Sequence, residues 1–142
     1  MSETPPSSPE PKNVWPCVNY VDARAAIRFL TEALGFVETL TVPGDSEDVV
    51  VHAELRWPEG GGVMLGTANR PDSPFSQLPT SCASLYVVTD DPHAIYARAT
   101  KAGAKVVSEM RDEDYGSTGF SVADPEGNLW SFGTYRGEPL SD

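Results

Sequence analysis

The 142-residue chain is 39% hydrophobic and 22% charged, an ordinary composition for one globular domain. Its net charge of −11 argues against the clustered cations that nucleic-acid binding needs, and its apolar runs fall far short of the roughly 20 residues of a membrane helix. Residues 1–12 hold four prolines without a basic start or an apolar stretch. We therefore expect a disordered tail, a cytoplasmic protein, and neither nucleic acid nor a membrane as partner.

The first half of the chain predicts one helix and four strands. Residues 13–21, rich in Val, Trp and Tyr, predict a strand. Asp22 then stands where a helix N-cap belongs, apolar residues recur at helical spacing, and Gly35 marks the end of the helix. Three further strands are predicted at residues 36–42, 48–57 and 63–68.

The strand predicted at residues 48–57 alternates strictly between apolar and polar side chains. His52 and Glu54 are two residues apart and therefore share one face of that strand. The opposite, apolar face is expected to pack on a helix and carries Val49, Val51, Ala53, Leu55 and Trp57.

Residues 69–80 contain three prolines and predict a linker, after which the order of elements repeats. The second set comprises a strand, a helix and three strands, predicted at residues 83–88, 91–102, 105–110, 119–123 and 129–135. A shift of 68 residues places Asp22 on Asp90, Ala26-Ile27 on Ala94-Ile95, and Gly35 on Gly103. The pattern predicts an α+β fold of two βαβββ modules at residues 13–68 and 81–136, with tails at 1–12 and 137–142.

Five short stretches carry a family resemblance: Tyr20-Val21-Asp22, Ala26-Ile27-Arg28-Phe29-Leu30, Leu34-Gly35-Phe36, Ala102-Gly103-Ala104, and Asp124-Pro125-Glu126-Gly127-Asn128-Leu129-Trp130. In this order they resemble the vicinal oxygen chelate superfamily of glyoxalase I, bleomycin-resistance proteins and extradiol dioxygenases. The resemblance implies two curved sheets that each close half of a U-shaped cleft. In short members the modules usually pair across a homodimer, although the sequence leaves open whether they pair within one chain or across two.

Enzymes of this superfamily hold a divalent metal with side chains from the first and fourth strands of each module. Matched through the stretches above, the ligand positions fall on Trp15, Leu65, Ser84 and Ser131, none of which is a normal metal ligand. Moving the register by one residue in either direction brings in no better set of donors. The resemblance therefore implies a member that lacks the metal ligands and uses no cofactor.

Strand parity indicates which side chains line the cleft. Two loop aromatics, Tyr115 and Phe75, are expected near the mouth, with local packing as the alternative. Trp130 and Phe132 are assigned to the core beneath the helices. The inward-facing candidates mix aromatic rings with hydroxyl and amide groups, which suits a flat, partly apolar ligand: Trp15, Asn19, Leu65, Ser84, Tyr86 and Ser131. For Trp15, simple burial in the core is the alternative.

Three interpretations of His52 and Glu54 stay open: a residual two-ligand metal site, a structural polar pair, or contact with a ligand that includes acid–base chemistry. Three functions follow. The first is a metal-independent protein that sequesters an aromatic or cationic toxic compound or antibiotic. The second is a metal-free lyase or isomerase with His52 or Glu54 as acid or base, and the third is a dimer whose cleft is vestigial.

Overall fold

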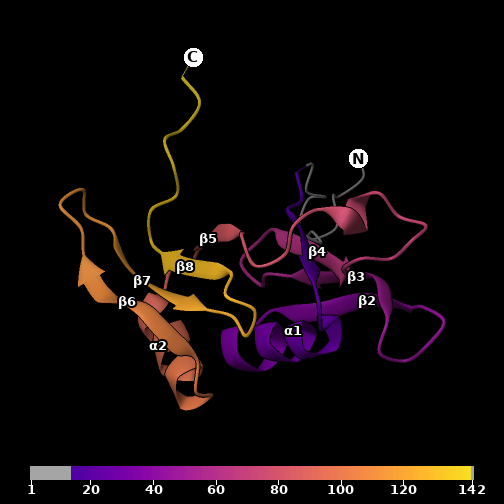
Figure 1. Cartoon of the computed structure of the whole chain (residues 1–142). Helices are drawn as coiled ribbons and strands as arrows, with labels where there is room; N and C mark the ends of the chain where they lie inside the picture. The colour runs from indigo at the N-terminus through magenta and orange to yellow at the C-terminus, as the bar shows by residue number, and fades with distance from the viewer. Residues whose placement is uncertain (1–13, 142) are drawn as a thin grey trace, which may run out of the picture.

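The computed structural model describes residues 14–141 and confirms an α+β fold of two βαβββ modules (Figure 1). The first module contains β1 (Cys17–Tyr20), α1 (Ala23–Phe29), a π-helical turn (Leu30–Leu34), β2 (Val37–Pro43), β3 (Val50–Arg56) and β4 (Gly62–Thr67). The second contains β5 (Ser84–Val88), α2 (Pro92–Lys101), β6 (Lys105–Asp112), β7 (Thr118–Ala123) and β8 (Leu129–Gly133). A short 3-10 turn, Phe75–Gln77, lies between them.

The two predicted tails differ in what is described of them. Residues 1–12 lie outside the described part of the chain, whereas residues 137–141 are described and contain neither helix nor strand. Within residues 14–141, no helix is long and apolar enough to cross a membrane.

Each module forms one four-stranded sheet, ordered β1-β4-β3-β2 in the first and β5-β8-β7-β6 in the second. The first strand of each module runs parallel to the last, and the other pairs are antiparallel. A parallel pair needs a long crossover connection, and the helices supply part of it. Equivalent strands therefore occupy equivalent places in the two sheets, as the repeated order of elements predicted.

The two helices begin and end with the predicted signals, but the repeat is offset by one residue at its start. Asp22 caps α1 through a hydrogen bond from the backbone of Ala25, as predicted. In the second module the cap is Asp91 and not Asp90, because Asp91 accepts the equivalent bond. The first module thus has one more residue between its cap and its closing glycine, and the π-helical turn absorbs it.

Strict alternation fails at the start of β3. Val50 is fully buried, whereas Val51, predicted to face the core, is 39% exposed. The register between β2 and β3 shifts here, since Val42 pairs with His52 and Pro43 with Val50. An extra residue in one strand is a β-bulge, which reverses the facing of all side chains on one side of it. From His52 onward the predicted alternation holds.

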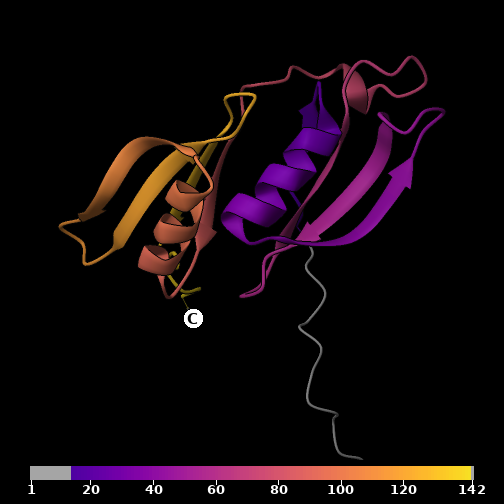
Figure 2. The ribbon, with the colours of Figure 1, turned by 90° about the horizontal axis from the view of Figure 1, so that it is seen from below.

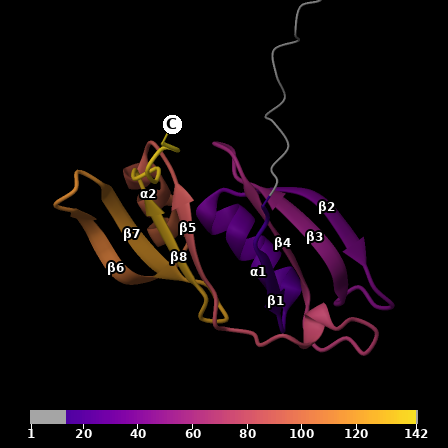
Figure 3. The ribbon, with the colours of Figure 1, turned by 90° about the horizontal axis from the view of Figure 1, so that it is seen from above.

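Both helices cover the same side of the molecule. Seen from below, α1 and α2 lie in front of their sheets (Figure 2), and the opposite view looks onto the strands (Figure 3). The core lies between the helices and the sheets, and Trp130 and Phe132 belong to it as predicted, each 1% exposed. The uncovered faces of the two sheets therefore point in the same direction.

The two modules meet at a seam centred on the carboxylate of Asp124, which is 5% exposed. Its Oδ2 accepts hydrogen bonds from the Tyr20 hydroxyl at 2.6 Å and from Trp130 Nε1 at 3.1 Å. Its Oδ1 accepts from the backbone N–H groups of Glu126 and Asn128. These donors replace the water that a buried carboxylate loses. Because Tyr20 belongs to β1, the bond joins the first module to the second.

Two Pro-Glu-Gly turns form further hydrogen bonds between the modules, one from each module to the other. Glu126, between β7 and β8, accepts from the backbone N–H groups of residues 21 and 22 at 2.8 and 2.7 Å, just before α1. Glu59, between β3 and β4, accepts from the Thr89 hydroxyl at 2.7 Å and the Asp90 N–H at 2.8 Å, just before α2. Each module thus places a carboxylate at the positive end of the other module's helix.

We predict that Tyr20→Phe destabilises the protein by about 1–3 kcal/mol, because it removes one donor from a buried carboxylate and changes little else. Urea unfolding followed by tryptophan fluorescence measures the effect. Tyr96→Phe is the matched control, since the Tyr96 hydroxyl donates to Glu109 at the surface and its loss should leave the midpoint nearly unchanged. Equal midpoints for the two variants would contradict the assigned role of Asp124.

The same tyrosine predicts a pH dependence. Burial, followed by the hydrogen bond and charge of Asp124, raises the pKa of Tyr20 well above its ordinary value. The folded state then holds the phenolic proton more tightly than the unfolded state, so the free energy of unfolding should fall as the pH rises above about 10. Unfolding experiments between pH 8 and 11 should show a smaller fall for Tyr20→Phe than for the wild type.

Candidate functional site

The uncovered face of the first sheet is aliphatic around one polar pair. His52 Nε2 and Glu54 Oε2 lie 2.8 Å apart on β3, with side chains 38% and 29% exposed. Beside them β2 presents three exposed aliphatic side chains, because their pairing partners on β3 face the same way: Val37, Leu40 and Val42. Trp15 lies at the edge of this face, where the Arg56 guanidinium is 5.2 Å from its ring centroid.

A cavity of about 330 Å³ opens on this face. Its polar lining includes Asn19, His52 and Arg70, and its apolar lining includes Met64 and Phe75. Arg70 donates to the carbonyl oxygens of residues 67 and 51, so its guanidinium is held in place. The cavity can therefore offer a ligand one imidazole, one fixed cation and an aliphatic wall.

The predicted linker is an ordered loop that lies across this cavity. The side-chain amide of Asn19 donates hydrogen bonds to this loop, to the carbonyl oxygens of Phe75 at 2.8 Å and Leu78 at 3.4 Å. Ser76, fully buried, accepts from the backbone N–H of Arg70 and ties the loop to its own start. Phe75 is left 79% exposed at the cavity mouth.

The uncovered face of the second sheet is rich in hydroxyl groups. The lining of a cavity of about 180 Å³ on this face includes the ion pair of Arg111 and Glu113, two tyrosines and four serines: Tyr86, Tyr115, Ser108, Ser117, Ser121 and Ser131. Ser121 Oγ and Ser131 Oγ lie 2.7 Å apart, and the Tyr86 hydroxyl donates to the Tyr135 carbonyl oxygen at 2.6 Å. Burial raises the pKa of Tyr86, so this hydroxyl remains a hydrogen-bond donor at neutral pH.

Within one chain, the predicted site residues lie on two separate sheet faces, one in each module. The first module carries Trp15, Asn19, His52 and Glu54, and the second carries Ser84, Tyr86, Tyr115 and Ser131. The two uncovered faces have separate cavities within the chain. A larger cavity of about 440 Å³ runs along the seam between the modules. Ser84 and Tyr86 of the second module line it together with Pro16 of the first, and core residues such as Trp57 and Trp130 form its floor.

Leu65 borders the cavity of the first module, but its side chain does not project from the uncovered face as strand parity predicts. Its side chain is 3% exposed and packs in the core, because β4 pairs Leu65 with Val18 and Ala53, which face the helix. The uncovered face of β4 carries Met64 and Gly66 instead. The parity chosen for this strand was one residue out of register.

Sequence reasoning missed Arg70 and Tyr135. Nothing in the sequence marks Arg70, whose place depends on the fold of the linker. Tyr135 could have been found, because it has the same parity as Ser131 at the end of the predicted strand. Its ring packs edge-on against Tyr115, with centroids 5.5 Å apart.

The donors on the uncovered faces do not fit a divalent metal site. The first and fourth strands present Cys17, Asn19, Met64 and Gly66 in one module, and Ser84, Tyr86 and Ser131 in the other. A metal site needs about three imidazole, carboxylate or thiolate donors together. Among residues 14–141, no three His, Cys, Asp or Glu side chains lie close enough for this.

Comparison with known proteins agrees with the fold. Residues 14–132 match the Glyoxalase/Bleomycin resistance protein/Dioxygenase superfamily, and the chain belongs to this family. An uncharacterized protein of Mycobacterium bovis is 36% identical over 121 residues, covering 79% of this chain and 76% of that protein.

Solved structures of other proteins share this fold. The crystal structure of TioX from Micromonospora sp. ML1 has a TM-score of 0.72 at 28% identity, covering 85% of this chain and 98% of TioX. A glyoxalase/bleomycin resistance protein from Streptomyces sp. CB03234 has a TM-score of 0.63 at 23% identity, covering 85% of this chain and 98% of that one. At this identity the second likeness establishes the fold alone.

We predict that Asn19→Ala loosens the linker, because the two bonds that hold residues 75–78 are lost. Hydrogen exchange followed by mass spectrometry should then show faster exchange in residues 70–80, with β7 unchanged. Gln77→Ala is the control, since its amide bonds only within the loop, to the Arg70 carbonyl oxygen. Equal exchange in the Asn19 variant and the wild type would mean that Asn19 does not anchor the loop.

Proposed function

We propose that this protein is a metal-independent small-molecule-binding protein that sequesters an aromatic or cationic toxic compound or antibiotic. The single observation that carries the proposal is the pair of uncovered sheet faces, each with its own cavity and, as far as residues 14–141 are concerned, neither with a metal-donor set. Aliphatic walls, aromatic rings and a few fixed polar groups are the usual lining of ligand sites. Membership of the glyoxalase and bleomycin-resistance family supports this class of function.

The complete binding site, in this proposal, forms in a homodimer. The two faces of one chain point the same way, so neither can close over the other (Figures 2 and 3). Pairing the first module of one copy with the second module of another would enclose a ligand between an aliphatic and a hydroxyl-rich surface. The direct ligand contacts would then be Trp15, His52 and Glu54 from one copy and Ser84, Tyr86, Tyr115 and Ser131 from the other.

We also propose a cytoplasmic location. Cys17 and Cys82 are both free and exposed. Free surface thiols persist in the reducing cytoplasm. This supports a cytoplasmic location for the binding activity.

A metal-free enzyme is the second candidate, favoured by the 2.8 Å contact between His52 and Glu54. A carboxylate that accepts a hydrogen bond from an imidazole orients the ring, which is the arrangement of a general base. His52 lines the cavity of the first module, whereas Glu54 does not. His52 would therefore contact a substrate, with Glu54 positioning it.

The deciding experiment is a thermal-shift screen of metabolites and antibiotics, followed by calorimetry and product analysis of each hit. We expect binding of one ligand per site, a raised melting temperature, and unchanged ligand recovered afterwards. His52→Ala should weaken binding without abolishing it. Tight stoichiometric binding of zinc, nickel or manganese would contradict metal independence.

Two outcomes separate the candidate functions. Turnover of a hit that collapses in both His52→Ala and Glu54→Gln would establish the enzyme, while the exposed His93→Ala serves as control. A screen without any ligand-induced shift would leave neither function standing and would indicate a vestigial cleft.

A further inference from the structure

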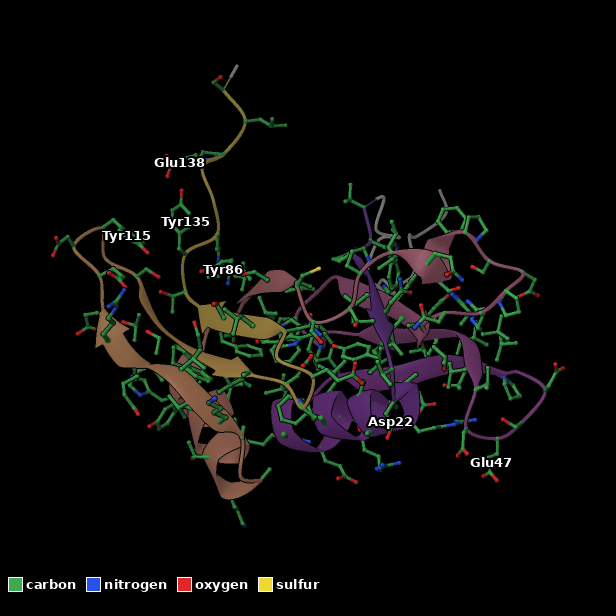
Figure 4. The ribbon with its side chains drawn as sticks, viewed as in Figure 1. Asp22, Glu47, Tyr86, Tyr115, Tyr135 and Glu138 are labelled. Atoms are coloured by element: carbon green, nitrogen blue, oxygen red, sulfur yellow. The ribbon has the colours of Figure 1, made fainter. Side chains whose placement is uncertain are left out.

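Three tyrosines gather at the rim of the second module's uncovered face, and they come from three different segments. Tyr86 lies on β5, Tyr115 on the turn between β6 and β7, and Tyr135 just after β8 (Figure 4). They are 50%, 68% and 39% exposed. Large exposed aromatic side chains that converge from separate segments mark a binding surface more often than isolated ones do.

The rings are held in place by contacts with one another and with the backbone. Tyr115 and Tyr135 meet edge to face with an interplanar angle of 75°, an arrangement that leaves the electron-rich face of at least one ring available. The Tyr86 hydroxyl is fixed on the Tyr135 carbonyl oxygen at 2.6 Å. The Tyr135 hydroxyl in turn donates to Glu138 Oε2 at 3.2 Å. The cluster is therefore organised before any ligand arrives.

The charge around the tyrosines is negative. Asp112 ends β6, Glu113 and Asp114 follow in the turn before β7, and the segment after β8 carries Glu138. Two arginines lie on the same segments, and each is paired: Arg111 with Glu113 at 2.6 Å, and Arg136 with Asp90. The carboxylates of Asp112, Asp114 and Glu138 remain without a cationic partner among the ion pairs of the described residues.

We infer that this rim, which we call the tyrosine rim (Tyr86, Tyr115, Tyr135 and Glu138), selects an organic cation carried by a small ring system. A cation over an aromatic face is stabilised by the quadrupole of the ring, and nearby carboxylates add to that attraction. The adjoining cavity of about 180 Å³ suits one small ring system, since whole drug-sized ligands occupy about 300–1,000 Å³. This inference rests on the proposed function and specifies the ligand chemistry of one half of the site.

The test compares two probes of nearly equal shape, 1-methylquinolinium and quinoline, at pH 8, where only the first is charged. Both are titrated into the full-length protein by calorimetry and by tyrosine-selective NMR. We expect the cation to bind at least tenfold more tightly, and its advantage to shrink as salt is raised. Tyr115→Leu should remove most of the advantage, whereas Tyr115→Phe, which keeps the ring, should retain it.

Matched controls separate the tyrosine rim from general effects. Tyr96→Leu removes a tyrosine of α2 that lines neither uncovered face and should not change the preference for the cation. Glu138→Gln should weaken binding of the cation about twofold to fivefold, while Glu32→Gln, which removes the same charge far from the rim, should not. Circular dichroism establishes that every variant is folded.

Three results would overturn the inference. These are equal affinity for the two probes, an equal loss in Tyr96→Leu and Tyr115→Leu, and no binding of either probe by the wild type. In each case the proposed small-molecule binding survives if the broader screen yields another ligand. If no compound in the broader thermal-shift screen binds, the proposed function is wrong, independently of the result with the two quinoline probes.

Discussion

The arrangement of the molecule depends on how two modules of one chain hold each other. The buried carboxylate of Asp124 accepts a hydrogen bond from Tyr20 of the other module, and Glu59 and Glu126 each cap the approach to the other module's helix. A carboxylate buried against backbone N–H groups is costly to displace, because removing its partners leaves a charge without water. This reciprocal joint makes both helices cover one side and leaves both sheet faces uncovered on the other.

That geometry makes the two faces independent surfaces with different side chains. The first face carries aliphatic side chains around His52 and Glu54, and the linker anchored by Asn19 closes part of it. The second face carries serines and the tyrosine rim. A ligand enclosed between faces of these two kinds would have an apolar portion and a polar or charged portion. The repeated βαβββ order thus gives one scaffold with two chemically different faces.

Most of the fold could be predicted because its signals are local. Asp22 is a helix N-cap, and Gly35 and Gly103 are the left-handed glycines that follow the two helices. The alternation of side chains in β3 and β8 predicted the correct faces for His52, Glu54, Ser131 and Trp130. Errors occurred where pairing with a distant strand decides the outcome. Leu65 faces the core because Ala53 is its neighbour, and Val51 is exposed because β2 and β3 slip by one residue. Neither pairing is visible in a single stretch of sequence.

The sequence by itself determined the duplicated βαβββ order, the cap of the first helix at Asp22, and the absence of His, Asp and Glu from the first and fourth strands. These depend on residue type and spacing along the chain, and they survive a one-residue error in register. Only the tertiary structure decided that the site residues fall on two separate faces, that the linker folds over one of them, and that Tyr135 joins Tyr86 and Tyr115. These features depend on packing between segments that lie tens of residues apart in the sequence. The hydrogen bonds of Asp124, Glu126 and Glu59 to the other module fix that packing, and the local sequence pattern does not encode it.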